Sequence, residues 1–195
     1  MAANGRVWRL IGGSYDENLV VNIPSDYASL QEAVDYYHGK ITFSNRARLN
    51  INIQTGHALT SGLVCKGGDY SYIDITSDDA TVTLSTTFSA AQIDADITGI
   101  GTNNAVFAVL KGANSPYIDI LVDANLKVDS GHGVFIGNTS QGQVGSGKGV
   151  INAEYHGFLV LNNSGMDAGA AKFSGSNWGC RVTTNSNADV RPVGS

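Results

Sequence analysis

Two short segments of this 195-residue chain place a carboxylate close to an imidazole. Asp129 lies three residues before His132, and Glu154 lies two residues before His156. Such a set can carry out general acid–base work or remove the proton α to a uronate carboxyl group. Glycan hydrolysis needs two carboxylates, either about 5 Å or about 6.5–9.5 Å apart. We therefore take these four residues as the candidate catalytic set. The competing interpretation is that Asp and Glu simply occupy solvated turns.

Aromatic residues near these segments suggest contacts with sugar rings. Tyr155 stands between Glu154 and His156, and Trp178 follows in a similar stretch of sequence. Aromatic faces are apolar and can stack on the apolar faces of sugars, while a carboxylate accepts hydrogen bonds from hydroxyl groups. We therefore expect Trp178, Tyr155 and Glu154 to form a carbohydrate-binding set.

Three other sequence patterns resemble ligand-binding motifs but lack residues that those motifs need. The run 142–149 approaches a phosphate-binding loop but ends in glycine, where the hydroxyl that holds Mg²⁺ would stand. Asp94 and Asp96 lack the glycine and the distal glutamate of an EF-hand loop. Cys65 and Cys180 make neither a disulfide framework nor a four-ligand zinc site. We predict no metal and no cofactor, and two buried thiols.

Composition and charge restrict the class of protein. Lys and Arg total 12 against 17 Asp and Glu, giving a net charge of −5, which argues against a nucleic-acid partner. Only 15% of residues are charged and 24 are glycine, which favours short strands and turns. No apolar run reaches the length of a membrane span, so we expect no membrane insertion. The N-terminus lacks a signal-peptide pattern, which predicts synthesis in a cytoplasm without export by the usual route.

One helix is predicted, just after Pro24. Ser29 is a candidate N-cap, and Glu32 stands three residues later, as in a capping box. Gly39 fits the position that ends a helix. Apolar residues recur at the spacing of one helical face. They are Leu30, Ala33, Val34 and Tyr37.

Beyond residue 49 the pattern alternates, and it repeats. Residues 132–140 read HGVFIGNTS, 156–164 read HGFLVLNNS and 178–186 read WGCRVTTNS, at offsets of 24 and 22 residues. The segment 72–75 also recurs at 117–120, an offset of 45 residues, close to two such periods. Short strands at this period are typical of a parallel β-helix, in which each coil buries its apolar face on the next. An antiparallel sandwich is the alternative, but it does not require such even spacing.

The alternation assigns side chains to faces. Arg181 should face solvent, so Cys180 should be inward and unreactive. The same register leaves Phe135 and Leu159 pointing outward on adjacent coils, which predicts a contact between subunits. Asn138 and Asn162 fall at equivalent turn positions and should form a short asparagine ladder.

The predicted fold is all-β, a single-stranded right-handed parallel β-helix with an N-terminal capping helix. Residues 1–24 are predicted to be an irregular attachment segment. Residues 25–190 are predicted to hold the capping helix and the β-helix, and residues 191–195 to be a tail.

In its layout of helix and strands, the sequence resembles a known superfamily. The helix over Tyr27–Tyr36 resembles the capping helix of pectate-lyase-like right-handed β-helix proteins. The strands over Leu49–Ile53 and Gly67–Ile75 resemble bacteriophage tail-spike and tail-fibre members. The resemblance covers roughly residues 20–190 and includes no catalytic signature. The chain is shorter than large tail spikes.

The resemblance implies a virion protein, usually a homotrimer, that attaches to host surface polysaccharide. Its N-terminal segment would contact other tail proteins. Two alternatives stay open, which are a polysaccharide lyase or glycoside hydrolase and a purely architectural tail subunit.

Overall fold

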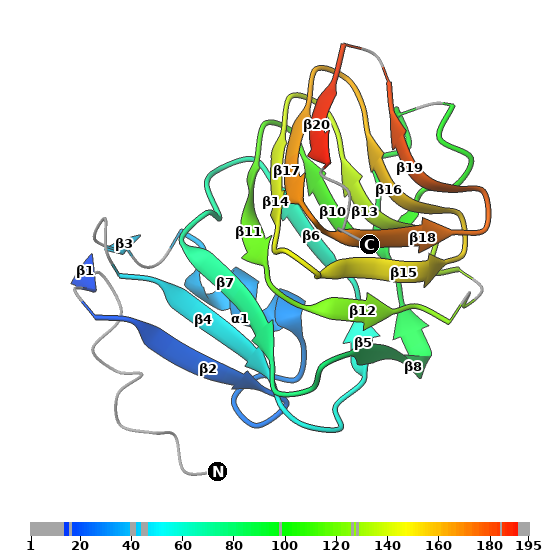
Figure 1. The fold of residues 1–195 in the computed structure, drawn as a ribbon. Coiled ribbons are helices and arrows are strands. Elements are labelled where there is room, and N and C mark those ends of the chain that lie inside the picture. The colour runs from blue at the N-terminus through cyan, green and yellow to red at the C-terminus, as the bar shows by residue number, and fades with distance from the viewer. Residues whose placement is uncertain are drawn as a thin grey trace.

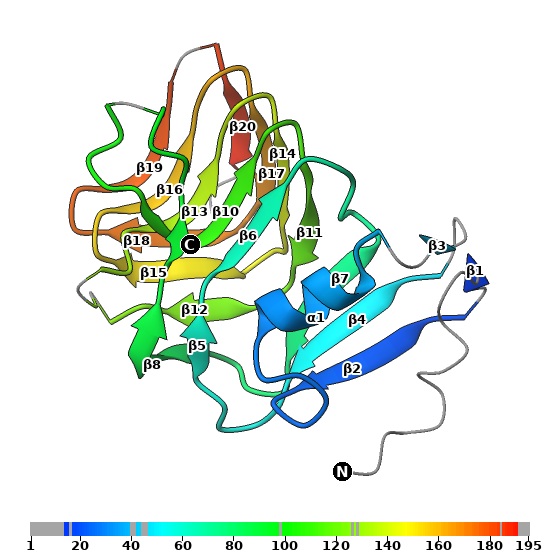
Figure 2. The same cartoon turned by 180° about the vertical axis from the view of Figure 1, so that it is seen from behind.

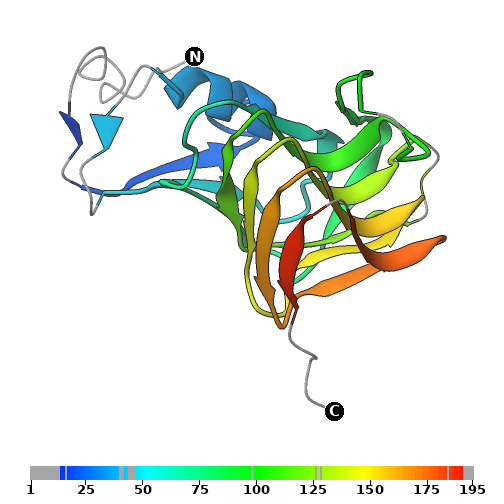
Figure 3. The ribbon, with the colours of Figure 1, turned by 90° about the horizontal axis from the view of Figure 1, so that it is seen from above.

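The computed structural model describes residues 14–15, 17–39, 42–43, 47–97, 99–125, 127, 129–183 and 185–190. They form a β-solenoid of about six turns, in which successive turns contribute strands to three sheets (Figures 1 and 3). Pairing between turns is parallel throughout, which confirms the parallel β-helix and excludes the antiparallel sandwich.

The strands fall into three long sheets and one short one. The seven-stranded sheet contains β2 (Leu19–Ile23), β4 (Leu49–Ile53), β7 (Ile73–Ser77), β11 (Asn114–Ile118), β14 (Gln141–Val144), β17 (Gly165–Gly169) and β20 (Asn187–Val190). The five-stranded sheet contains β5 (Leu59–Ser61), β8 (Val82–Ser89), β12 (Leu121–Asp123), β15 (Gly149–Ala153) and β18 (Lys172–Gly175). The six-stranded sheet contains β6 (Leu63–Lys66), β10 (Asn104–Leu110), β13 (His132–Ile136), β16 (His156–Val160) and β19 (Trp178–Val182), with β9 (Ala91–Gln92) antiparallel to β10. A short pair joins β1 (Ser14–Tyr15) to β3 (Thr42–Phe43).

The predicted helix is present as α1 (Leu30–Tyr37), beside the first turn of the solenoid (Figure 2). The Ser29 hydroxyl accepts a hydrogen bond from the Glu32 amide at 3.2 Å, and the Glu32 carboxylate accepts one from the Ala28 amide at 2.9 Å. The first bond is that of a capping box, whereas the Glu32 carboxylate reaches the amide of the residue before the N-cap instead of that of Ser29. All four predicted apolar residues of the helix are buried in the main core. Within the described residues, no helix is long and apolar enough to span a membrane.

The offsets of 24 and 22 residues match the observed register. Val134 pairs with Phe158, and Phe158 pairs with Cys180. The repeated glycine in second position has a steric cause, because a Cβ at Gly133 would lie 2.3 Å from the carbonyl oxygen of Gly157. The corner between two sheets is therefore too tight for any side chain. The asparagine ladder is also confirmed, since Asn162 donates to the Asn138 side chain at 3.0 Å.

The repeat expected between residues 72–75 and 117–120 is wrong in both register and period. Ile75 pairs with Ile118, so the two strands are offset by 43 residues and lie in adjacent turns. The extra length is an insertion: the chain forms β9 and then residues 93–103 before it enters β10. One long turn therefore contains about as many residues as two ordinary turns, and the sequence alone does not distinguish the two cases.

The boundary predicted at residue 24 is also corrected. Leu19–Ile23 was expected to be irregular, but it forms β2 and pairs with all five residues of β4. Val21 and Ile23 alternate inward and join the main core, which explains the strand. Residues 1–13 of the predicted attachment segment and the whole predicted tail, 191–195, lie outside the described residues.

Two apolar clusters flank the six-stranded sheet. The main cluster fills the solenoid and includes Val134, Ile136 and Phe158. The outer cluster lies on the opposite side of the sheet and includes Phe135 and Leu159 together with residues of the 91–100 segment. We call residues 91–97 and 99–103 the flap, because side chains of this segment cover the outer face.

Candidate functional site

The flap determines whether Phe135 and Leu159 are available for contact with another subunit. Both side chains point outward from the solenoid as predicted, but both are 0% exposed within a single chain. The flap residues Ile93, Ile97 and Ile100 cover them, so they are not available to another subunit. The predicted subunit contact through these two residues is therefore wrong. An apolar residue facing outward can be covered by an insertion of the same chain, and strand periodicity does not distinguish the two cases.

The two candidate catalytic histidines are buried beside the same cluster. His132 and His156 are both 0% exposed, and their rings stack with centroids 5.1 Å apart. His132 also lies 5.8 Å from the Phe135 ring. Of the four ring nitrogens, none has a hydrogen-bond partner of good geometry among the described residues. In this conformation neither imidazole can exchange a proton with a substrate.

Burial also fixes their charge state. The pKa of His132 is lowered to about 4, chiefly by desolvation and then by the neighbouring His156 and Arg181. The carbonyl groups of Thr102 and Ile100 act in the opposite direction but are outweighed. Burial, followed by Arg181, likewise lowers the pKa of His156 to about 4. Both rings are therefore neutral near pH 7.

The carboxylates of the predicted catalytic set do not gather around the histidines. Glu154 accepts a hydrogen bond from the Gly131 amide at 3.0 Å, so it holds the turn of the preceding coil. Asp129 is exposed in a turn, with a left-handed backbone at φ 70°. These positions agree with the alternative interpretation of the sequence, in which Asp129 and Glu154 occupy turns and take no part in catalysis.

The two aromatic residues predicted to bind carbohydrate, Tyr155 and Trp178, differ in their exposure. The Tyr155 ring lies 4.4 Å from that of His156, and a Cβ at Gly101 of the flap would lie 2.4 Å from it, so the flap packs directly on this ring. Trp178 is opposite His156 in the register but is 57% exposed, because β19 is the last strand of its sheet. Its indole face is open to a ligand.

Cys180 shows the same effect of the final turn. It pairs with the inward residue Phe158, so the predicted register is right, but its side chain is exposed. No further strand covers β19 within the described residues, and the predicted shielding of the thiol is therefore wrong. Cys65, on β6, is buried as predicted, and burial raises the pKa of its thiol.

The seven-stranded sheet has the most extended polar face. Its strands alternate as LNINI in β4 and IDITS in β7, with the isoleucines buried in the solenoid. The outward residues of all seven strands align across the sheet and are all at least partly exposed. We call this line the lateral row. It consists of Val20, Asn50, Asp74, Tyr117, Gln143, Asp167 and Asp189.

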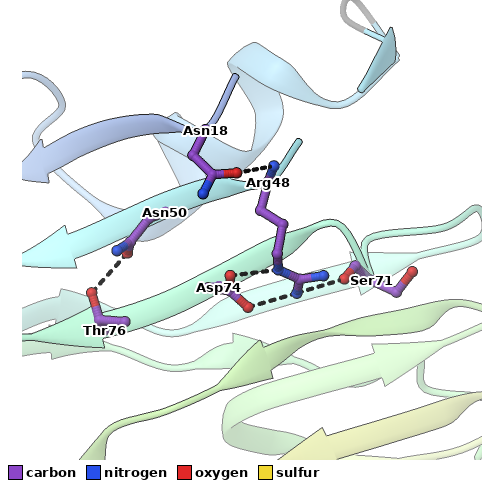
Figure 4. Close-up of polar contacts among 6 residues, drawn as sticks. All are labelled: Asn18, Arg48, Asn50, Ser71, Asp74 and Thr76. Carbon is purple, nitrogen blue, oxygen red and sulfur yellow. Dashed lines mark hydrogen bonds and ion pairs between the residues drawn. The ribbon is translucent and has the colours of Figure 1, made fainter. Parts of the chain in front are cut away.

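At its N-terminal end the lateral row is held by charge-assisted contacts (Figure 4). The Arg48 guanidinium donates to both carboxylate oxygens of Asp74, at 2.5 and 2.6 Å, and to the Ser71 carbonyl oxygen at 2.9 Å. The Thr76 hydroxyl donates to the Asn50 side chain at 2.7 Å. Bidentate pairing raises the pKa of the Arg48 guanidinium. These side chains are therefore fixed before any ligand arrives.

The middle of the lateral row carries an aromatic residue. A Cβ placed on Gly145 would lie 3.1 Å from the Tyr117 hydroxyl and 2.6 Å from a carboxylate oxygen of Asp119. Tyr117 and Asp119 therefore approach the same bare glycine, and the Tyr117 side chain is partly exposed. Beyond it, Gln143 and Asp167 are exposed. Sequence reasoning missed this site because the alternation was used to locate the core, and the long turn concealed the register between β7 and β11.

The comparisons with known proteins give no relative to guide the assignment. No family model, no curated protein and no solved structure matches the chain. Among the described residues, no group of three or more metal-ligating side chains is placed to hold a metal ion.

Proposed function

We propose that this chain is an attachment module of a phage-like tail and that it binds host surface polysaccharide along the lateral row. One observation carries the proposal, namely that six of the seven aligned positions in the lateral row, all except Val20, hold a polar or aromatic side chain on adjacent parallel strands. Strands lie about 4.8 Å apart, so the row extends roughly 30 Å. A polymer of sugars presents hydroxyl groups at intervals along a comparable length.

The charges on this face favour a neutral glycan. The Arg48 cation is already paired with Asp74, and the same face also carries the carboxylates of Asp119 and Asp167. An acidic polysaccharide would be repelled at low salt. Tyr117 supplies the apolar stacking surface, and exposed Trp178 supplies a second one at the end of the solenoid.

The finer features of the fold belong to the same proposal. We infer a right-handed solenoid that α1 caps. The Gln31 side chain of α1 accepts a hydrogen bond from the Val64 amide at 2.7 Å and donates one to the Val64 carbonyl at 3.2 Å. The amide thus satisfies both backbone groups of one residue on the first strand of the six-stranded sheet, as a neighbouring strand would.

Location in the virion and association into a homotrimer are also part of the proposal. The predicted contact with other tail proteins involves the N-terminal segment, of which residues 1–13 lie outside the described residues. Because Phe135 and Leu159 are covered, trimer formation would need another surface.

Cleavage of the glycan is the alternative, and one observation favours it. Asp167 and Asp189 are direct neighbours on adjacent strands, and both are exposed. Carboxylates on adjacent strands can reach the separation of about 5 Å that a retaining glycosidase uses. Replacing Asp167 with Asn should then abolish the release of reducing ends while leaving glycan binding intact.

The test of the proposal is retention of the purified protein on an array of bacterial surface polysaccharides. The double variant Tyr117→Ala/Gln143→Ala should bind tenfold or more weakly, about 1.4 kcal/mol, and remain folded. Thr60→Ala, exposed on β5, is the matched control and should bind like the parent. A separate Trp178→Ala variant shows whether the end of the solenoid contributes. Equal binding by parent and double variant would refute the lateral row as the site, and no binding to any glycan would favour the architectural alternative.

A further inference from the structure

A pocket opens at the corner where the chain leaves β4, next to the polar face. Its volume is about 530 Å³, within the range of small-molecule sites. A hydrogen bond links the pocket to the polar face. Asn52, a partly exposed residue of β4, donates to the carboxylate of the pocket residue Asp78 at 3.0 Å, and its side chain also contacts Asn22. The pocket is lined by Pro24, Gln54, Thr55, Gly56, His57 and Asp78.

The walls of this pocket are held by bonds between turns. The second carboxylate oxygen of Asp78 accepts a hydrogen bond from the Thr55 amide at 3.2 Å, and Asp79 accepts one from the Gly56 amide at 2.6 Å. Gly56 has a left-handed backbone at φ 74°, which favours glycine. The pocket shape is therefore set by the fold before a ligand binds, which lowers the entropic cost of binding.

Two polar side chains in the pocket keep unused hydrogen-bonding capacity. The Ser25 hydroxyl donates to Gln54 Oε1 at 2.6 Å, which leaves the Gln54 amide nitrogen as a donor without a partner among the described residues. His57 Nε2 is buried and also has no partner there. An unpaired buried polar atom is unfavourable, so a ligand that pairs with it gains binding free energy. Because no side-chain hydrogen bond fixes the ring, a flip of the imidazole can present either nitrogen to a ligand.

The chemistry of the lining selects the ligand class. The pocket offers an amide donor, an imidazole that can donate or accept, and a carboxylate acceptor, together with the apolar ring of Pro24. Its lining includes one carboxylate and neither Lys nor Arg, so it disfavours phosphate and carboxylate ligands. Hydroxyl groups both donate and accept, and therefore match this mixed set.

We propose that the pocket at residues 54–57 binds one neutral sugar unit, as an end subsite for the glycan that lies on the lateral row. The inference rests on the proposed function, since it assigns a position to the end of the same ligand. It also adds specificity, because the amide, imidazole and carboxylate groups of the pocket can pair with the hydroxyl groups of one sugar unit.

The experiment is a titration with neutral mono- and disaccharides, followed by the NMR signals of the His57 ring and the Gln54 side-chain amide. At least one sugar should shift both signals and saturate. The double variant Gln54→Ala/His57→Ala should weaken that binding fivefold or more, while Thr60→Ala should leave it unchanged. The parent titration maps the site even if the double variant fails to fold.

The outcomes separate the two proposals. If polysaccharide binds through the lateral row but no sugar shifts the two pocket signals, the end subsite is refuted and the proposed function stands. If sugars shift those signals while no polysaccharide binds, the subsite stands and the extended lateral site fails. If neither is observed, both proposals are wrong.

Discussion

The six-stranded and the seven-stranded sheets share parallel pairing and the same solenoid, but their outer faces differ. In β13 and β16 every residue is buried, because the main core lies on one side and the flap on the other. In β4 and β7 the inward isoleucines alternate with partly exposed polar residues. A parallel strand covered on both sides reads as a continuous apolar run, and one covered on a single side alternates.

This difference separates a covered face of the solenoid from an open one. The histidines of the six-stranded sheet lie beneath the flap and have no access to substrate. The lateral row of the seven-stranded sheet is available for binding. Residue type alone would select the histidines as the candidate site. Their burial excludes them, and the exposure of the lateral row makes the row the better candidate.

The largest contrast between the sheets should come from a core deletion. Phe135→Ala should lower the free energy of unfolding by about 3–5 kcal/mol, because it leaves a cavity beneath the flap. Gln143→Ala, on the exposed face, should change it by no more than about 0.5 kcal/mol. Urea denaturation of both variants measures the contrast, and a mild effect of Phe135→Ala would mean that the flap does not cover this residue in solution.

Acid should weaken the flap-covered side specifically. The pKa of His132 and of His156 falls from 6.5 in the unfolded chain to about 4 in the fold, so the unfolded state binds more protons in this window. Their contribution is fully present above about pH 6.5 and is lost as the pH falls through 4. It amounts to at most about 3 kcal/mol per imidazole.

The measurement is the urea midpoint near neutral pH and at about pH 4.5. The double variant His132→Phe/His156→Phe should lose most of the difference between the two conditions, whatever its absolute stability. An unchanged pH dependence would show that the imidazoles are solvated.

A smaller effect is expected for the ion pair on the polar face. Arg48→Met should reduce stability by about 1 kcal/mol, because the pair is bidentate but its Arg side chain is 41% exposed. A double-mutant cycle with Asp74→Asn isolates the coupling between the two side chains. Coupling close to zero would mean that solvent screens the pair and that this end of the lateral row is not held in place.

The smallest effect concerns the final turn. Cys180 should react rapidly with a thiol reagent in the native protein and Cys65 only on unfolding, since burial protects Cys65 and raises its pKa. Cys180→Ser should leave stability unchanged. Slow labelling of both thiols would indicate that another surface covers β19.

Local sequence determined much of this fold. The helix over residues 30–37 follows from its capping box and apolar spacing, which act within a few residues. The offsets of 24 and 22 residues fix the register, because stacked turns must align their apolar residues and their corner glycines. The asparagine ladder follows from the same repeat.

Only the tertiary structure decided which surfaces remain open. Phe135 is covered by a flap more than thirty residues away in sequence, and Cys180 is uncovered because no strand among the described residues follows β19 in its sheet. Strand periodicity specifies the direction of a side chain, but exposure depends on what packs over it, which is a long-range property of the chain. The lateral row was hidden for the same reason, because the 43-residue offset between β7 and β11 appears only when the strands pair.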